Sequence, residues 1–296
     1  MTRDIFVDSP SLEKNFASDN NSGISPEVVS ILNKANYGHA PGYGDDDWTK
    51  RACDKIRDLF GTDCSVFFVF NGTAANALSL AALCRSYHAV LCHRMSHVET
   101  DECGAPEFFG GGTKVIGLEG EEGRLPADAI EEAASRRDDV HFPKVRALSL
   151  TQATEVGTVY GLDDLRAIRE VCERNALKLH LDGARFANAV AHLEVSPKKL
   201  IDASGADVLS FGATKNGSMV GDAVVIFDKD LAREFEYRRK QTGQLASKMR
   251  YLAAPWVAFL ENDLWLSNAR HANSIAEQLS SKLTEIPEVK VLFPRE

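Results

Sequence analysis

Short apolar runs alternate with amphipathic stretches through most of the chain. The first run, residues 66–70, is entirely nonpolar, so it predicts a strand that is buried on both faces. Similar runs predict six further strands, at residues 89–92, 114–118, 145–150, 177–182, 207–211 and 223–227. Strands of this length that are separated by helical segments indicate βαβ units, and therefore an α/β fold with a mostly parallel central sheet.

Helical periodicity fills most of the intervals between these runs. It predicts helices over residues 47–60, 74–86, 126–137, 162–175 and 197–203, and Ser25-Pro26-Glu27 is typical of a further helix start. After Lys229 the pattern changes to a long charged helix over 231–248, a second helix from 251 to about 283 and one strand at 288–293. A lone strand needs a partner, because its edge groups are otherwise unpaired.

Composition places the chain among ordinary globular proteins. It has 296 residues, of which 44% are hydrophobic and 26% charged, which is enough for one large domain and a smaller one. The net charge of −9 argues against nucleic acid or an anionic membrane as a partner.

Two further observations favour a cytoplasmic location. No apolar run approaches the ~20 residues of a membrane span, and residues 1–6 lack the apolar core of a signal peptide. The six cysteines form no C-x-x-C pair, which indicates reduced thiols and predicts no metal site.

Candidate chemistry lies just after the predicted strands, where open α/β sheets bind their ligands. Gly72 and Thr73 follow the first strand and open a helix. Gly72 lets a ligand approach the backbone, Thr73 can cap the helix or donate its hydroxyl, and a helix N-terminus attracts anions. The pair is either a phosphate site or only a helix cap, and it is neither a Walker loop nor G-x-G-x-x-G.

An acidic residue ends the strand at 177–182, and an arginine follows three residues later. Asp182 places a carboxylate at the mouth of this strand, and a buried carboxylate needs a partner. Arg185 is one possible partner, in a structural ion pair. Alternatively, Asp182 faces a protonated ring nitrogen and Arg185 binds the carboxylate of a substrate.

Lys215 lies on a tight connection between two apolar runs, among small and hydroxylated residues. It is either a solvated lysine in a hairpin loop or a reactive amine. His97 is either structural or able to stack on a ring. With the phosphate site, the acid and the arginine, these residues fit pyridoxal 5'-phosphate, which carries a phosphate, a flat ring, a pyridine nitrogen and an aldehyde that condenses with lysine.

Two motifs carry a family resemblance: Leu-His-Leu-Asp-Gly-Ala-Arg at 179–185, with Asn188-Ala189 behind it, and Ser-Phe-Gly-Ala-Thr-Lys-Asn-Gly at 210–217. From about residue 16 to its end the chain resembles the L-threonine aldolases of the β-eliminating lyase group, in their low-specificity or phenylserine-aldolase-like branch. The resemblance implies a pyridoxal-phosphate-dependent, aspartate-aminotransferase-like (type I) fold. It also implies a homodimer or homotetramer with active sites at the dimer interface.

The same resemblance divides the chain into three parts. Residues 1–45 form an N-terminal segment that joins the active site, 46–248 the large cofactor-binding domain, and 249–296 the start of a small α/β domain. Family members continue for some tens of residues past 293–295, so the small domain is expected to be truncated and to lack a second carboxylate-binding arginine.

The resemblance also assigns roles around the cofactor. Lys215 forms a Schiff base with it, and Asp182 pairs with its pyridine nitrogen. Gly72 and Thr73 bind its phosphate, and His97 stacks on its ring and is a candidate base.

Further roles concern the substrate and a neighbouring subunit. Ser18 and Arg185 bind the substrate carboxylate, and Lys240 reaches the phosphate in a neighbouring subunit. Where many members have histidine after a strand, Glu155 or Thr154 stands here, so the pocket for the substrate side chain differs.

The implied reaction is retro-aldol cleavage of L-threonine-like or L-allo-threonine-like β-hydroxy-α-amino acids to glycine and an aldehyde. Another pyridoxal-phosphate lyase, such as a β-eliminating one, and a non-catalytic protein that keeps the fold are the alternatives.

Overall fold

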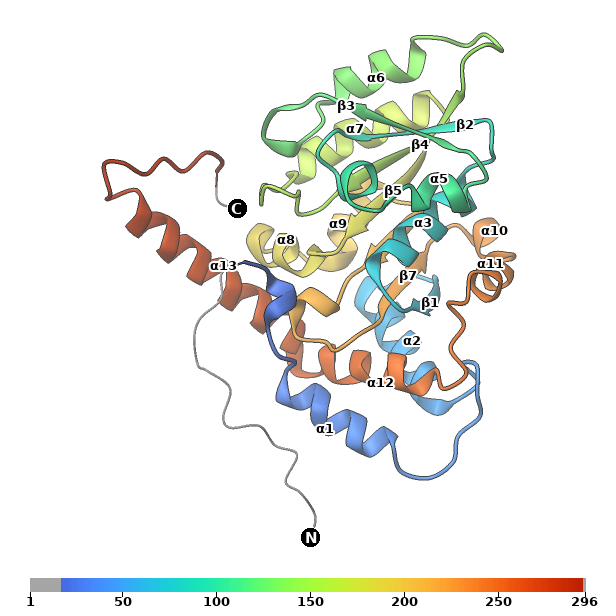
Figure 1. The fold of residues 1–296 in the computed structure, drawn as a ribbon, viewed down its shortest axis with the longest axis vertical. Coiled ribbons are helices and arrows are strands. Elements are labelled where there is room, and N and C mark those ends of the chain that lie inside the picture. Colours follow the sequence, from blue (N-terminus) through green and yellow to red (C-terminus); the bar gives the residue numbers. More distant parts are fainter. Residues whose placement is uncertain (1–16, 295–296) are drawn as a thin grey trace.

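The computed structural model describes residues 17–294 and is built on one seven-stranded sheet in the order β1-β7-β6-β5-β4-β2-β3 (Figure 1). Residues 1–16, which include the stretch examined for a signal peptide, and residues 295–296 lie outside the described part. The strands are β1 Ser65–Val69, β2 His88–His93, β3 Lys114–Leu118, β4 Lys144–Thr151, β5 Lys178–Gly183, β6 Val208–Phe211 and β7 Asp222–Ile226. All seven apolar runs therefore form strands, with ends within one residue of the predicted ones.

The sheet is mixed but mostly parallel, as predicted. β3, β2, β4, β5 and β6 are parallel, whereas β7 is antiparallel to both β6 and β1. The reason is the connection after β6, residues 212–221, which contains only a 3₁₀ turn at Thr214–Asn216. A parallel neighbour needs a crossover of a dozen residues or more, so this short connection turns the chain back. It is also the connection that carries Lys215.

Helices cover both faces of the sheet. They are α1 Pro26–Ala35, α2 Asp47–Phe60, α3 Gly72–Leu83, α4 His97–Thr100, α5 Ala105–Phe109, α6 Ala127–Ser135, α7 Leu162–Arg174, α8 Phe186–Leu193, α9 Pro197–Ser204, α10 Lys229–Ala232, α11 Phe235–Gln241, α12 Arg250–Phe259 and α13 Leu264–Leu283. The five helices predicted between strands and the start at Ser25 are confirmed, while α4, α5 and α8 were not predicted. None of the helices in residues 17–294 combines the length and the apolar character that a membrane span requires.

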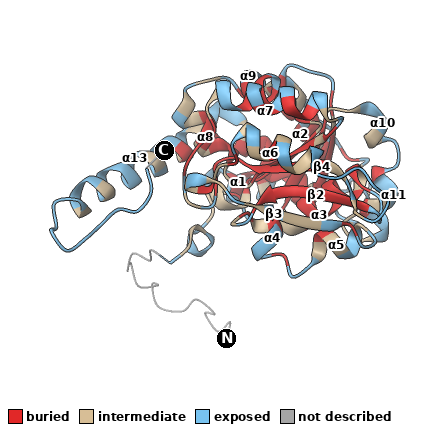
Figure 2. Cartoon of the chain, turned by 90° about the horizontal axis from the view of Figure 1, so that it is seen from above, coloured by how far each residue is buried: buried red, intermediate tan, exposed pale blue. Residues whose placement is uncertain are grey.

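Side chains of the strands alternate between two cores, one on each face of the sheet. In β1, Val66 and Phe68 join the core shared with α2, α7 and α12, whereas Phe67 and Val69 pack with α3 and α11. The strands are accordingly buried along most of their length, except for β3 at the edge of the sheet, none of whose residues is buried (Figure 2). Because α12 is part of the larger core, the domain boundary proposed after residue 248 falls directly before a buried helix.

The long charged helix predicted over 231–248 is wrong. The chain forms α10 and α11 and then a loop, because Gly243 adopts a left-handed backbone with φ of 76°. The helix predicted from 251 is also divided, since Asn262 and Asp263 have φ of 53° and 55° between α12 and α13. Charge and apolar spacing continued through both breaks, so periodicity alone did not reveal them.

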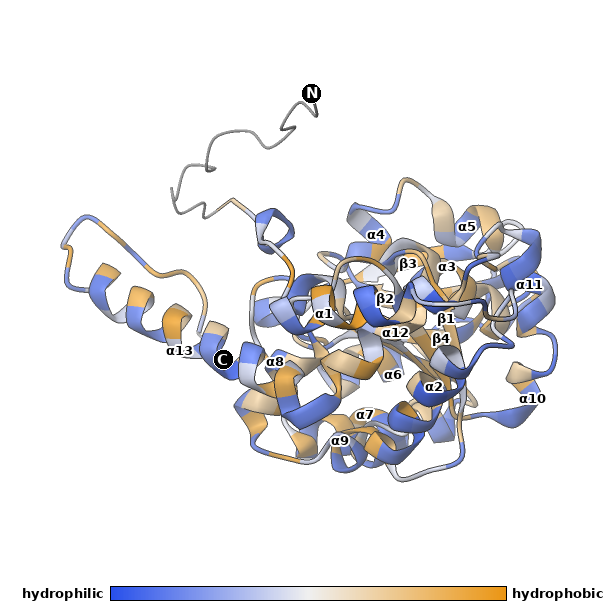
Figure 3. Cartoon of the chain, turned by 90° about the horizontal axis from the view of Figure 1, so that it is seen from below, coloured by the Kyte–Doolittle hydropathy of each residue, from blue (hydrophilic) through white to orange (hydrophobic). Residues whose placement is uncertain are grey.

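The strand predicted at 288–293 does not form. These residues are exposed and irregular, and no strand of the described chain lies beside them to pair with their backbone. They follow the outer half of α13, which projects from the body of the molecule and carries apolar bands (Figures 1 and 3). Ile275 and Leu279 on it are 45% and 42% exposed.

The ring of Phe211 occupies the centre of the larger core. Its centroid lies 4.9 Å from that of Trp256 and 5.5 Å from that of Phe186. We expect Phe211→Ala to lower the free energy of unfolding by about 3–5 kcal/mol, because it leaves a cavity among rigid rings. Urea unfolding measures this change. Phe108→Ala is the matched control, since Phe108 is 79% exposed and its loss should change the unfolding free energy very little.

Candidate active site

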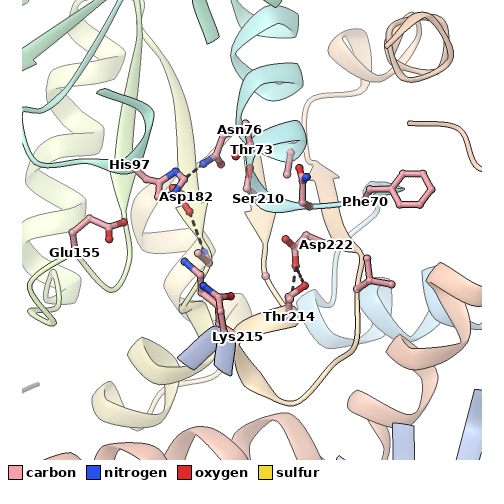
Figure 4. A pocket seen from close by; sticks show the side chains of 17 residues that line it. Phe70, Thr73, Asn76, His97, Glu155, Asp182, Ser210, Thr214, Lys215 and Asp222 are labelled. Carbon is pink, nitrogen blue, oxygen red and sulfur yellow. Dashed lines mark hydrogen bonds between the residues drawn. The ribbon is translucent and has the colours of Figure 1, made fainter. Parts of the chain in front are cut away.

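A cavity of about 490 Å³ opens at the carboxyl ends of β1, β5 and β6 (Figure 4). Six of the predicted site residues line it: Gly72, Thr73, His97, Glu155, Asp182 and Lys215. Antiparallel β7 begins at the same edge, because its first residue pairs with the last residue of β1. The topology therefore brings residues that are far apart in sequence to one place.

The N-terminus of α3, at Gly72 and Thr73, forms one wall of the cavity and is called the α3 mouth below. Asn71, rather than Thr73, caps this helix, since its side-chain oxygen accepts the backbone N–H of Ala74 at 2.9 Å. The predicted cap at Thr73 is therefore wrong. The backbone N–H groups of Gly72 and Thr73 have no protein acceptor within the described residues and lie where the positive end of the helix dipole adds to their effect. This wall can bind an anion.

Asp182 is the buried acid of the site. It is 2% exposed at the end of β5 and accepts hydrogen bonds from Asn76 Nδ2 at 2.9 Å and from the backbone N–H of Ala184 at 3.1 Å. Arg185 is not its partner, because the Arg185 guanidinium donates to Asp19 Oδ2 at 2.9 Å. The alternative of a structural Asp182–Arg185 ion pair is therefore wrong.

Lys215 lies in the turn that joins β6 to β7, and its side chain is directed toward the same space as those of His97 and Asp182 (Figure 4). Asp222 fixes this turn, since its Oδ1 accepts the Ala213 N–H at 3.0 Å and the Thr214 hydroxyl at 3.2 Å. Burial raises the pKa of Asp222, and these hydrogen bonds and the charge of Lys215 oppose that rise.

Gly217 closes the lysine turn against α1. Its φ is 94°, its carbonyl accepts the N–H of Ser25 at 2.9 Å, and a side chain at this position would collide with Ser25. The turn is therefore held on both sides of Lys215. Asp222 binds the residues that precede the lysine, and Ser25 binds Gly217, which follows it.

His97 begins α4 and lines the cavity. Its Nδ1 lies 2.8 Å from Glu102 Oε1, and its Nε2 lies 3.9 Å from Asp101 Oδ2. The hydrogen bond with Glu102 raises the pKa of His97, although partial burial of the ring opposes it.

Glu155 extends from a tight turn on the His97 side of the cavity (Figure 4). The turn is closed by the Thr154 N–H, which donates to the Thr158 carbonyl at 2.9 Å, and by a 2.7 Å hydrogen bond between the two threonine hydroxyls. Thr154 is buried by these contacts, so Glu155 is the one of the two candidates that lines the cavity.

Ser18, Arg185 and Lys240 lie outside the lining. The hydroxyl of Ser18 accepts the N–H of Asn20 at 3.1 Å, and Asn20 itself lines the cavity. Arg185 is held by Asp19 in the same segment. Lys240 is farther along the chain on α11, with its Nζ 4.9 Å from the centroid of the Tyr43 ring.

Three residues of the site were not recognised in the sequence: Asn76, Glu102 and Asp222. Each had a weak signal. Asn76 is a polar residue in the middle of an otherwise apolar helix, and Asp222 is an acid at the start of an apolar strand. Glu102 lies five residues after His97 in a stretch with several acids, so nothing distinguished it.

These features fit pyridoxal 5'-phosphate. The α3 mouth suits its phosphate, Asp182 its ring nitrogen, His97 the face of its ring and Lys215 its aldehyde. Within residues 17–294 no three His, Cys, Asp or Glu side chains gather closely enough to hold a metal ion.

Comparison with known proteins supports the same interpretation. The chain is 56% identical to a low specificity L-threonine aldolase of a Pseudomonas species, over 95% of this chain and 81% of that one. The solved structure of Leishmania major threonine aldolase matches with a TM-score of 0.89 at 27% identity and covers 94% of this chain and 81% of that one.

A third comparison concerns the fold alone. Cystalysin from Treponema denticola, whose structure contains pyridoxal 5'-phosphate, matches with a TM-score of 0.68 at 16% identity, over 90% of this chain and 68% of that one. The model of the β-eliminating lyase family matches residues 15–295, which include the whole cavity. A chain that matches this model over almost its full length, with a lysine, a buried acid and an anion-binding helix at one sheet edge, belongs to the β-eliminating lyase family, a family of pyridoxal-phosphate-dependent enzymes.

Proposed function

We propose that this protein is a pyridoxal-phosphate-dependent aldolase that cleaves L-threonine-like β-hydroxy-α-amino acids to glycine and an aldehyde. The observation that carries the proposal is the shared cavity of Lys215, Asp182 and His97 in a chain 56% identical to a low specificity L-threonine aldolase. L-Threonine would give acetaldehyde as the second product.

Each group has a defined task in this reaction. When bound, pyridoxal phosphate supplies an aldehyde that condenses with an amine and a ring that accepts the electron pair of the broken Cα–Cβ bond. Lys215 supplies the amine that holds the cofactor between turnovers. Asp182, whose carboxylate accepts hydrogen bonds from Asn76 and Ala184, would face the ring nitrogen and favour a proton there.

His97 is the proposed base for the β-hydroxyl proton. Glu102 holds its Nδ1, so Nε2 is the nitrogen available to a ligand in the cavity. Loss of the hydroxyl proton drives cleavage, because the oxygen then becomes the carbonyl of the leaving aldehyde.

Ser18 and Arg185 are proposed to bind the substrate carboxylate. Arg185 already pairs with Asp19, so the substrate must share or replace this partner. The exchange keeps the guanidinium paired with and without substrate, which lowers the desolvation cost of binding.

We further propose a homodimer or homotetramer in the cytoplasm. The aromatic side chains of Tyr37 and Tyr237 are 92% and 78% exposed and would be covered in an assembly, and Lys240 follows Tyr237 by three residues on α11. All six cysteines are unpaired, and five of them are buried. Light scattering on the purified protein measures the assembly.

The first prediction concerns Lys215. The wild-type protein should be yellow, borohydride should attach the cofactor covalently to Lys215, and L-threonine should yield glycine and acetaldehyde. Lys215→Ala should lower turnover by roughly 10³-fold or more, because no other lysine of residues 17–294 lines the cavity. Ammonia and a keto acid as products would favour β-elimination instead, and a colourless protein that releases no cofactor would refute both enzymatic functions.

The second prediction concerns the α3 mouth. A Cβ on Gly72 would lie 3.5 Å from Asp222 Oδ2, an ordinary contact distance, so Gly72→Val should fold normally. Its side chain would nevertheless fill the place of the phosphate, and we expect cofactor affinity to fall by about tenfold or more. Fluorescence titration with pyridoxal phosphate measures the affinity. In the control Gly23→Val the new side chain meets open space, and the affinity should not change.

The third prediction concerns Glu155. If its carboxylate faces the β-hydroxyl or side chain of the substrate, Glu155→Gln should change the ratio of kcat/KM for L-threonine and L-allo-threonine by about tenfold, the value of one hydrogen bond to a charged group. Glu121→Gln, at an acid that does not line the cavity, should leave the ratio unchanged. An unchanged ratio in the Glu155 variant would contradict the proposed role.

A further inference from the structure

A continuous hydrogen-bonded chain runs behind the cavity from His97 to Asp182. His97 Nδ1 lies 2.8 Å from Glu102 Oε1, Asn76 Nδ2 donates to the same oxygen at 2.8 Å, and its second hydrogen bond reaches Asp182 Oδ2 at 2.9 Å. The four residues come from α3, α4, the loop after α4 and β5. One amide nitrogen thus joins two carboxylates, and one carboxylate oxygen joins that amide to the imidazole.

The middle of this chain is closed to solvent. The Glu102 side chain has no exposed surface, and Asn76 is 3% exposed. Glu102 Oε2 and Asn76 Oδ1 have no hydrogen-bond partner in the described structure. Burying a carboxylate with one oxygen unpaired is costly, so these groups are poorly explained as packing alone.

With both carboxylates ionised, the arrangement has one chemically consistent assignment. The Asn76 amide must direct its nitrogen to the two carboxylates, because its oxygen there would meet two acceptors. Glu102 Oε1 is then an acceptor, and His97 must carry a proton on Nδ1 to donate to it. Nε2 therefore faces the cavity in a fixed orientation.

We propose that Glu102 and Asn76 are positioning residues: Glu102 fixes the tautomer and direction of the His97 ring, and Asn76 holds Glu102 and Asp182 at a set separation. Their assistance to catalysis rests on the proposed aldolase function, whereas the tautomer and its coupling to Glu102 depend only on the geometry. Asn76 lines the cavity but offers no group that reacts, and Glu102 is not part of the lining.

Four acidic groups surround His97. Glu102 is in direct contact, Asp101 on its own helix lies 3.9 Å from Nε2, and Asp182 from β5 and Glu155 from the loop after β4 act through their charges. Glu102, Asp182 and Glu155 raise the pKa of His97, and the Glu102 hydrogen bond is the largest contribution. Removing the charge of Glu102 should therefore have the largest effect on the protonation of His97.

The test compares Glu102→Gln with Glu99→Gln in protein freed of cofactor. Glu99 is an exposed acid on α4, so the control removes the same charge two residues from His97 without touching the chain of hydrogen bonds. Histidine-ring NMR across a pH series reports the tautomer and the titration midpoint. Glu102→Gln should move the His97 midpoint to lower pH, a proton affinity about tenfold weaker, and Glu99→Gln should leave it near the wild-type value.

A merely structural role is distinguished by kinetics. In the holoenzyme, Glu102→Gln should lower kcat by about 10²-fold with little change in KM, and it should have no additional effect in the His97→Phe variant. Asn76→Leu should give a weaker form of the same change. Equal losses from Glu102→Gln with and without His97 would overturn the positioning role.

The two proposals fail differently. If His97 shifts in Glu102→Gln but the wild-type protein cleaves no threonine, the hydrogen-bonded chain stands and the aldolase function is wrong. If threonine is cleaved but the His97 midpoint and tautomer are the same in both variants, the positioning role is wrong and the aldolase function stands.

Discussion

The requirement that a buried carboxylate be hydrogen-bonded determines much of this site. Asp182 is almost completely enclosed at the end of β5, so it depends on donors that the fold must bring to it. One donor is local, the N–H of Ala184, but the other is Asn76 in the second turn of α3. Satisfying Asp182 therefore fixes α3 against β5, and the helix mouth at Gly72 and Thr73 is placed at the same time. The hydrogen bond between Asn76 and Asp182 therefore sets the position of the anion-binding wall relative to the acid.

The lysine turn depends on a second buried carboxylate. Asp222 begins β7 and accepts hydrogen bonds from residues 213 and 214, so the strand that leaves the turn also holds the strand end that enters it. A lysine on a freely moving loop would lose its place whenever the loop opened. Here the loop is tied to β7 through Asp222. The amine of Lys215 is therefore held close to His97, Asp182 and the α3 mouth.

Much of the fold follows from the sequence because strand positions depend on local apolar runs. The same holds for Lys215, Asp182 and Gly72, which stand at strand ends where ligand-binding residues are expected. The partners of those residues could not be predicted in this way. Arg185 follows Asp182 by only three residues but pairs with Asp19. Asn76 is indistinguishable in the sequence from an ordinary helix residue, and only the folded structure places it beside β5. Helix breaks at Gly243 and Asn262 were missed because positive φ angles interrupt a pattern of side chains that continues through them.

The pairing of β1 with β7 has a consequence for the order in which the molecule is made. β1 is at the edge of the sheet, and within the described residues its only strand neighbour is β7. Ser65 therefore cannot form its strand pair until Ile226 has been synthesised. While the chain leaves the ribosome, β2, β4 and β5 can associate early and α3 can pack on β5 through Asn76, but β1 has no strand partner until β7 has emerged. That same event closes the turn around Lys215. The pairing of β1 and the turn that carries the amine are therefore completed together, after α3 has been placed on β5.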